Sequence, residues 1–311
     1  MNTRVTNISM YQFYKMIPDE QAAREYFEDM RWTKGRVCPH CGSMNTVAVK
    51  DEIPQPYRCK DCRKHFSVRT GTILTSSKVS LQTWLLATYL MHTAKKGVSS
   101  CQMARQLGTT QKTAWMLCHK IREIWTVPVA HFNGKVEADE TYLGGLEKNK
   151  HADKKLRAGR GIVGKQAVLG IRARTGKIIA TTACSTEQEQ IHQFIKDNVN
   201  PGSTIYTDEH KSYNGLQESY EHESINHSTG EYARGQAHTN SIESFWALLK
   251  RGYIGTFHHF SMKHADRYIN EFAARNNNKR CDTVDVLAIT AKSITGKTLP
   301  YKELIYVGTQ G

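Results

Sequence analysis

Three carboxylates lie within four consecutive positions of the segment VEADETYLGG, residues 136 to 145: Glu137, Asp139 and Glu140. Two carboxylates about 4 Å apart repel each other by about 4 kcal/mol at an effective dielectric constant near 20. A protein that holds such groups together usually places a cation between them or raises the pKa of one of them. The segment therefore indicates a site at which carboxylates are held close together, although the net charge of the chain is +14.

Two of the acids follow short apolar runs that read as strands. VEAD (136–139) ends on Asp139, and STIYTD (203–208) ends on Asp208. Open α/β sheets collect their chemistry at strand ends, so we expect Asp139 and Asp208 to face each other if the two strands are neighbours. We interpret Glu137 and Glu140 as ion-paired surface acids that the alternation of the strand turns away from Asp139.

A third acid stands in the segment HTNSIESFWALLK, which reads as a helix. The helical spacing puts Asn240, Glu243 and Lys250 along one stripe. An inward acid on such a helix supplies a metal ligand, and a lysine two turns further on supplies a phosphate contact. Oxygen ligands of this kind suit Mg²⁺ or Mn²⁺ rather than zinc.

Four cysteines predict a second metal site. Cys38 and Cys41 form one C-x2-C pair, Cys59 and Cys62 form another, and 17 residues separate the pairs. This spacing is typical of a tetrahedral zinc site in which two tight turns each supply two thiolates. We therefore predict a zinc ribbon with structural Zn²⁺.

The segment VSSCQMARQLGTTQKTAWMLCHKIREIW reads as a helix, a turn at Gly108 and a second helix. This pattern favours a helix-turn-helix, although any helical hairpin gives a similar pattern. The second helix begins with Gln111, Lys112 and Thr113. Major-groove readers place their base contacts at that end of the recognition helix, so we predict that these three residues bind DNA.

The composition also favours a polyanionic partner. The 311 residues contain 43 Lys and Arg against 29 Asp and Glu, and each neutralised phosphate releases counterions. A basic surface that serves solubility alone is the alternative. No apolar run approaches the ~20 residues of a membrane span, and the N-terminus lacks the pattern of a signal peptide. We therefore expect a cytoplasmic protein with no membrane partner.

The elements expected to position these residues change character near Pro128, where helices give way to strands. Strand-like runs at 166–174 and 177–185 precede a helix at 186–199, and two helices follow the strand at 203–208. This order predicts an α/β domain with a mixed sheet flanked by helices. The expected regions are an N-terminal helical segment (1–35), the zinc ribbon (36–70), a helical helix-turn-helix region (71–130), the catalytic domain (131–298) and a C-terminal tail (299–311).

Together, the segments VEADETYLGG, YTDEHKSY, HTNSIESFWALLKRGYIGTFHHFS and RYINEFAARNNN stand behind a four-cysteine ribbon. This set resembles a bacterial insertion-sequence family of DDE transposases, the one numbered fifteen ninety-five, from about residue 10 to 295. The resemblance implies a ribonuclease H-like catalytic domain. It also implies double-stranded DNA partners, namely the terminal inverted repeats and the target, a homo-oligomer on paired DNA ends, and a place at the bacterial nucleoid.

The resemblance further implies two-metal-ion cleavage and strand transfer, with Mg²⁺ ions about 3.5 to 4 Å apart. Asp139 and Asp208 match the first two metal ligands of the family. The third ligand varies among Glu, Asn and His within the family, and both Glu243 and Asn240 stand in the motif here. We favour Glu243 because Lys250 follows it at a spacing of seven residues, with Asn240 as a neighbouring or substitute ligand.

Two other functions use the same segments. One is a DNA-binding regulator, with zinc ribbon and helix-turn-helix, whose ribonuclease H-like domain has lost activity. The other is a stand-alone metal-dependent nuclease or resolvase. The presence of all three acids argues against the first, and the separate basic DNA-binding region argues against the second.

Overall fold

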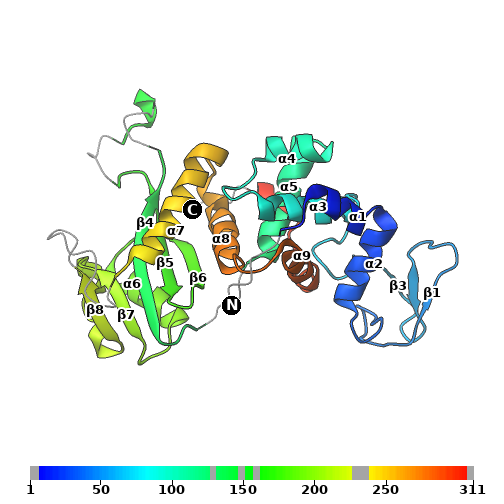
Figure 1. The fold of residues 1–311 in the computed structure, drawn as a ribbon, viewed down its shortest axis with the longest axis horizontal. Coiled ribbons are helices and arrows are strands. Elements are labelled where there is room, and N and C mark those ends of the chain that lie inside the picture. The colour runs from blue at the N-terminus through cyan, green and yellow to red at the C-terminus, as the bar shows by residue number, and fades with distance from the viewer. Residues whose placement is uncertain (1–6, 127–130, 146–150, 157–161, 226–237, 307–311) are drawn as a thin grey trace. The chain divides into compact units, whose positions relative to one another are not determined.

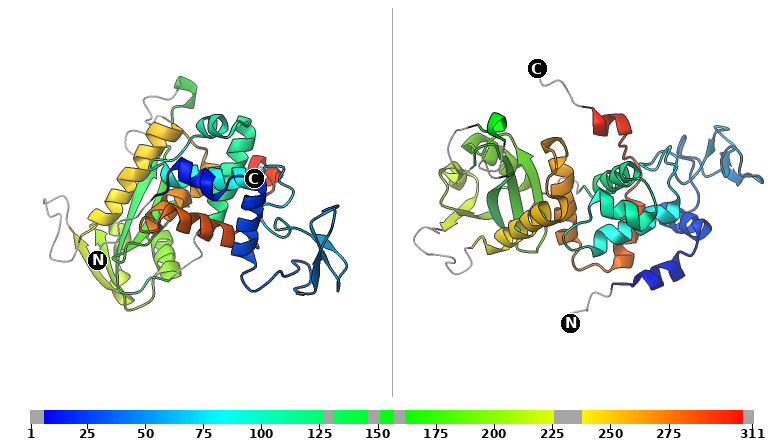
Figure 2. Two further views of the ribbon diagram at one scale, coloured as in Figure 1. Left: turned by 45° about the vertical axis from the view of Figure 1, so that its right-hand side comes forward. Right: turned by 90° about the horizontal axis from the view of Figure 1, so that it is seen from above.

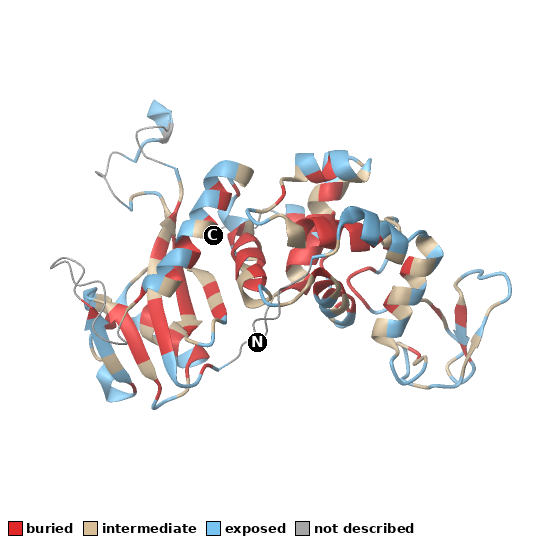
Figure 3. Ribbon diagram, viewed as in Figure 1, coloured by how far each residue is buried: buried red, intermediate tan, exposed pale blue. Residues whose placement is uncertain are grey.

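The computed structural model describes residues 7–126, 131–145, 151–156, 162–225 and 238–306 (Figure 1). The chain divides into two compact units, one made of residues 1–125 together with 280–311, and the other of residues 126–279. Each unit buries apolar side chains of its own (Figure 3). No helix among the described residues has the length and apolar character that crossing a membrane requires.

The first unit is mostly helical. Its helices are α1 (Met10–Met16), α2 (Glu20–Arg31), α3 (Leu81–Thr93), α4 (Ser100–Leu107), α5 (Gln111–Ile124), α9 (Thr283–Lys292) and α10 (Tyr301–Ile305). Helix α3 is apolar and buried over most of its length. The carboxylate of Glu20, in the first turn of α2, accepts hydrogen bonds from the backbone N–H groups of Leu81 and Gln82. This contact ties α2 to the N-terminus of α3, whose first N–H groups have no partner within the helix.

A small antiparallel sheet follows α2. Its strands are β1 (Thr46–Ala48), β2 (Tyr57–Cys59) and β3 (His65–Phe66), with β2 in the centre. The rings of Trp32, Tyr57 and Phe66 pack against one another with centroids 5.7 to 6.0 Å apart. This aromatic cluster supplies most of the apolar core of the sheet, because a segment of this size buries little apolar surface.

Helix α9 belongs to the first unit and packs against α2 and α3. The indole N–H of Trp125, at the end of α5, donates to Thr290 Oγ1 over 2.8 Å. The expected catalytic domain extended to residue 298, so the observed boundary differs. A helix buries its apolar side chains against whichever core packs on it, so local sequence does not fix the unit to which α9 belongs.

The second unit contains a five-stranded mixed sheet. Its main elements are β4 (Lys135–Leu143), β5 (Gln166–Ala173), β6 (Ile178–Ala183), α6 (Gln188–Asn198), β7 (Thr204–Asp208), β8 (Glu221–Ile225), α7 (Asn240–Gly252), a π-helical turn (Tyr253–Phe257) and α8 (Met262–Asn277). The strand order is β6-β5-β4-β7-β8. Strand β4 pairs antiparallel with β5 and parallel with β7. A mixed sheet with helices is consistent with a ribonuclease H-like domain.

Helices cover both faces of this sheet. Helices α7 and α8 pack on one face through a cluster that includes Val168, Trp246 and Phe272. Helix α6 packs on the other through a cluster that includes Val136 and Ile191. Figure 2 shows α7, in yellow, and α8, in orange, beside the green sheet. Residues of β4 with odd numbers therefore face α7, and those with even numbers face α6.

Two strands differ from the expected ones. Strand β4 does not end at Asp139, because it continues to Leu143 and stays paired with β5. Strand β8, after the expected strand at 203–208, was not predicted from the sequence. In both segments polar residues interrupt the apolar pattern, so only the backbone pairing shows that the chain is extended.

Candidate catalytic and metal sites

Asp139 lies in the middle of β4 on the face that α7 covers. Its carboxylate Oδ2 accepts a hydrogen bond of 2.9 Å from the indole N–H of Trp246. Burial raises the pKa of Asp139 to about 8, and the charges of Glu140 and Asp208 add to the effect. Removing a carboxylate from water disfavours its charged form. Asp139 is therefore held where ionisation is costly unless a cation is present.

Asp208 is the last residue of β7. The register between β4 and β7 pairs Val136 with Ile205 and Glu137 with Tyr206. Two positions further along, the same register brings Asp139 level with Asp208, just beyond the last paired residues. In keeping with this register, the charge of Asp208 contributes to the raised pKa of Asp139. The expectation that two neighbouring strands bring these aspartates together is met, with Asp139 mid-strand rather than at a strand end.

Glu140 is not a surface acid. It faces the α6 side, its side chain is 8% exposed, and the hydroxyl of Tyr213 donates to its Oε2 over 2.6 Å. Burial raises the pKa of Glu140, and the charge of Asp208 adds to this, while the hydrogen bond from Tyr213 opposes it. His210 Nδ1 lies 3.9 Å from the other carboxylate oxygen. The site thus holds three neighbouring carboxyl groups, and the pKa values of Asp139 and Glu140 are raised.

Glu137 is not a surface acid either, since its side chain is only 1% exposed. Residues two apart in a strand share a face, so Glu137 points to the same side as Asp139. Its carboxylate pairs with Arg174 and accepts a 2.8 Å hydrogen bond from the backbone N–H of Ile242 in the first turn of α7. A negative charge at this end of a helix is favourable. Glu137 therefore fixes the start of α7 against β4.

Helix α7 carries the remaining predicted ligands. Asn240 is its first residue, Glu243 lies in the first turn and Lys250 in the last, and all three are exposed. The hydroxyl of Thr239 donates to Glu243 Oε1 over 2.9 Å. Among the described residues, three or more ligand atoms of His, Cys, Asp or Glu lie within 4.8 Å of one another only at the cysteines. The structure thus brings together Asp139 and Asp208, but does not bring Glu243 to metal-binding distance of both.

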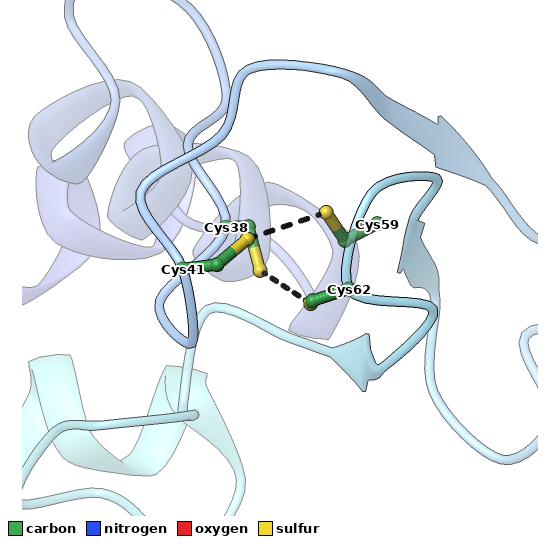
Figure 4. Close-up of side chains that lie close together, drawn as sticks. All are labelled: Cys38, Cys41, Cys59 and Cys62. Carbon is green, nitrogen blue, oxygen red and sulfur yellow. Dashed lines mark hydrogen bonds between the residues drawn. The ribbon is translucent and has the colours of Figure 1, made fainter.

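The four cysteines of the predicted zinc site converge (Figure 4). Cys38 Sγ lies 3.7 Å from Cys62 Sγ, and Cys41 Sγ lies 3.6 Å from Cys59 Sγ. All four sulfur atoms lie within 4.8 Å of one another. Four thiolates at this spacing form a closed tetrahedral set, which is the usual structural zinc site. The side chains fit Zn²⁺, and the predicted ribbon is confirmed.

Comparison with known proteins places the chain in a family. Residues 131–277 match the model of the ISXO2-like transposase domain, and residues 18–65 match the transposase zinc-ribbon domain. A protein in transposable element ISH50 of Halobacterium salinarum is 28% identical over 250 residues, which cover 76% of this chain and 84% of the relative. A transposase-like protein of Haemophilus influenzae is 31% identical over 103 residues, which cover 33% of this chain and 82% of the relative. The chain belongs to the ISXO2-like transposases.

In this ISXO2-like transposase the predicted DNA-reading segment forms two helices, α4 and α5. Gly108 adopts a left-handed conformation between them, and Thr110 caps α5 by accepting a hydrogen bond from the backbone N–H of Thr113. Gln111 donates to Ser100 Oγ over 2.8 Å, and Lys112 Nζ lies 4.6 Å from the ring centre of Tyr301. These contacts order the N-terminal end of α5, while its DNA contacts stay a prediction.

Three contacts around the predicted site residues were not expected from the sequence. Glu137 anchors α7, Tyr213 holds Glu140, and Trp246 holds Asp139. For Glu137 the signal was available, because a residue two positions from Asp139 shares its face. No sequence pattern pointed to Tyr213 or to the hydrogen bond of Trp246, since both depend on which elements pack together.

Proposed function

We propose that this transposase binds the terminal inverted repeats of its insertion sequence and catalyses metal-dependent strand cleavage and strand transfer. The observation that carries the proposal is the cluster of Asp139, Glu140 and Asp208, in which burial and mutual repulsion raise the pKa of two members. The same observation supports a cation site, because a dication removes the repulsion. Carboxylate oxygens are the ligands that Mg²⁺ and Mn²⁺ prefer.

Asp139 and Asp208 are the proposed ligands from the sheet, and Glu243 is the proposed third ligand, with Asn240 beside it. The Glu243 side chain is exposed on the first turn of α7, on the helix that also carries Trp246, the hydrogen-bond partner of Asp139. Lys250, two turns further along α7, is proposed to contact a DNA phosphate. Bound Mg²⁺ would neutralise the acids and the scissile phosphate.

The proposed reaction has two steps, hydrolysis at the element end and transfer of the freed strand to the target. In the first, a water oxygen attacks phosphorus at the element end, the bond to the 3′-oxygen breaks, and that oxygen leaves as a 3′-hydroxyl. In the second, the freed 3′-hydroxyl attacks a phosphodiester of the target, and the target strand leaves with its own 3′-hydroxyl. Neither step requires an oxidant or a reductant.

Binding is proposed to belong to the first unit. The zinc ribbon and the α4–α5 pair form a DNA-binding region in which Gln111, Lys112 and Thr113 read the terminal repeat from the start of α5. The net charge of +14 supports a nucleic-acid partner. Assembly as a homo-oligomer on paired ends, in the cytoplasm at the nucleoid, completes the proposal.

The test uses labelled DNA that carries the terminal repeats, with and without Mg²⁺. Asp139→Asn and Asp208→Asn should abolish cleavage and leave repeat binding nearly intact. Asp197→Asn, a change of the same kind at an exposed position of α6, is the matched control and should cleave normally. Substantial Mg²⁺-dependent cleavage by either active-site variant contradicts the proposal. Repeat binding without cleavage by the unmodified protein supports a regulator, and cleavage without sequence preference supports a nuclease.

A further inference from the structure

The hydrogen bond between Trp246 and Asp139 suggests a role for the tryptophan beyond core packing. We propose that Trp246 is a positioning residue that fixes the Asp139 carboxylate for metal binding, and that Gly170 provides the space for its ring. This inference rests on the proposed role of Asp139 as a metal ligand. Helix α7 thus contacts the first proposed ligand, Asp139, and also carries the third, Glu243.

The first observation is the direction of the hydrogen bond. The indole N–H of Trp246 donates to Asp139 Oδ2 over 2.9 Å, and the tryptophan is only 4% exposed. An indole has one donor and no acceptor, so the only hydrogen bond that the Trp246 side chain can donate goes to this carboxylate. A hydrogen bond to a charged group is stronger than one between neutral groups. It fixes one oxygen of Asp139 and thereby orients the carboxylate.

The second observation is independent of the first. Gly170 of β5 stands directly opposite Asp139 in the β4–β5 register. A Cβ at position 170 would lie 2.6 Å from both Cζ2 and Cη2 of Trp246, and 3.1 Å from Cδ1 of Ile242. Real Cβ atoms do not approach other carbon atoms to 2.6 Å, so any larger residue displaces the ring. The glycine therefore permits the one ring position from which the indole N–H reaches Asp139.

The helix that carries Trp246 is itself held in place from the sheet. Glu137 accepts a hydrogen bond from the backbone N–H of Ile242, and the Arg172 guanidinium donates to the backbone carbonyl of Ser241. Both contacts lie in the first turn of α7, one turn before Trp246. Because α7 is fixed to β4 and β5 at this turn, the tryptophan has little freedom to move away from Asp139.

Groups that orient a metal ligand typically change metal affinity by about 10- to 100-fold when they are removed. The measurement is Mn²⁺ binding by the full-length protein, followed by electron paramagnetic resonance of the free ion. Trp246→Phe keeps most of the ring and removes the N–H, so it should weaken Mn²⁺ binding by about 10- to 100-fold. Trp125→Phe removes the indole hydrogen bond to Thr290 in the first unit and is the matched control, which should keep the unmodified affinity.

A spectroscopic readout separates positioning from packing. Of the five indole N–H signals that the tryptophans give in a ¹H–¹⁵N spectrum, the one absent from Trp246→Phe belongs to Trp246. That signal should shift when Mg²⁺ is added to the unmodified protein and should not shift in Asp139→Asn. A role in packing alone predicts no metal-dependent shift of this signal.

Gly170→Ala adds a test that separates an effect on folding stability from an effect on the metal site. Alone, it should lower both thermal stability and Mn²⁺ affinity, because the added Cβ displaces the indole. Combined with Trp246→Phe, it should regain thermal stability, since phenylalanine lacks the two clashing carbons, while Mn²⁺ affinity stays low. Recovery of metal affinity in the double variant would overturn the positioning role.

The outcomes distinguish this inference from the proposed function. If Asp139→Asn loses Mn²⁺ binding but Trp246→Phe binds as tightly as the unmodified protein, the positioning role falls and the metal site stands. If the unmodified protein shows no binding that depends on Asp139, both fall. Weakened binding in Trp246→Phe, with normal binding in Trp125→Phe, supports both.

Discussion

At the scale of single residues, the sheet holds Asp139 in an unfavourable position when no metal is present. Burial and two neighbouring acids raise its pKa to about 8, from an ordinary value of 3.8. Strain of this kind is common at functional sites, where stability is given up for chemistry. The hydrogen bonds from the Trp246 indole and from the backbone of Glu140 oppose this shift, because both favour the charged form. At the proposed metal site, a bound cation would further favour the charged form of Asp139.

The raised pKa gives a prediction about pH. The folded state binds the Asp139 proton more tightly than the unfolded state, so the metal-free protein should lose stability as the pH rises from about 4 through about 8. Asp139→Asn should flatten this dependence and raise the thermal midpoint near pH 8. A gain of about 1 kcal/mol corresponds to roughly 2–4 °C in a unit of this size. Calorimetry in a chelator measures it, and a lower midpoint for Asp139→Asn would contradict it.

The third ligand can be decided by two substitutions on α7. An ionised Glu brings a full charge and up to two oxygens, whereas Asn offers one neutral oxygen, so the acid should matter more to a dication. Glu243→Gln should reduce cleavage by at least about 100-fold, and Asn240→Ala should reduce it less. Single-turnover cleavage of the repeat DNA measures both. If Glu243→Gln stays active while Asn240→Ala loses cleavage, the ligand roles are reversed.

Lys250→Ala belongs to the same comparison as a test of the phosphate contact. It should weaken DNA engagement near the metals and leave Mn²⁺ affinity unchanged, because an ammonium cannot ligate a cation. Unchanged DNA binding at several salt concentrations would remove Lys250 from the proposed site.

At the scale of elements, two short segments decide the architecture of the sites. Strand β4 supplies Glu137, Asp139 and Glu140, and alternation sends the first two to α7 and the third to Tyr213. The ribbon strands carry the cysteine turns and have little apolar core besides the aromatic cluster around Trp32. For a segment of this kind the free energy of metal binding is largely free energy of folding.

The zinc ribbon should therefore unfold without its metal. Cys59→Ser or Cys62→Ser leaves three thiolates, so the variant should lose zinc and repeat binding should weaken. The sheet of the second unit should keep its fold. Metal analysis, hydrogen exchange and a binding assay measure these effects. Cys184→Ser, at an exposed cysteine of the second unit, is the control and should change none of them. Normal repeat binding by a double Cys59/Cys62 variant would contradict the prediction.

At the scale of the whole molecule, the chain returns to its first unit after completing the second. Leu287 of α9 is completely buried, whereas Ile289 on the same helix is 40% exposed. Leu287→Ala should destabilise the first unit by about 2–5 kcal/mol, as is usual for a large-to-small change in a core. Ile289→Ala should have a much smaller effect. Hydrogen exchange resolved along the chain should show faster exchange in α2 and α3, and not in β4 and β5.

Local sequence patterns predicted the zinc ribbon and several of the helices and strands. The cysteine spacing determined the zinc ribbon, because a C-x2-C turn places two thiolates together whatever the rest of the chain does. The apolar runs that include Asp139 and Asp208 identified two strands, because strand periodicity is a local property, while their pairing as neighbours came from the structure. The helix carrying Asn240, Glu243 and Lys250 was readable from its 3.6-residue stripe for the same reason.

Tertiary structure decided what depends on contacts between distant segments. Only the sheet register set Gly170 opposite Asp139, and only the packing of α7 brought the indole of Trp246 to its carboxylate. Glu140 looked like a surface acid because a sequence does not show which helix covers a strand, whereas the shared face of Glu137 and Asp139 was readable from their spacing. In each case the deciding free energy comes from burial against a partner far away in the sequence, which local patterns do not encode.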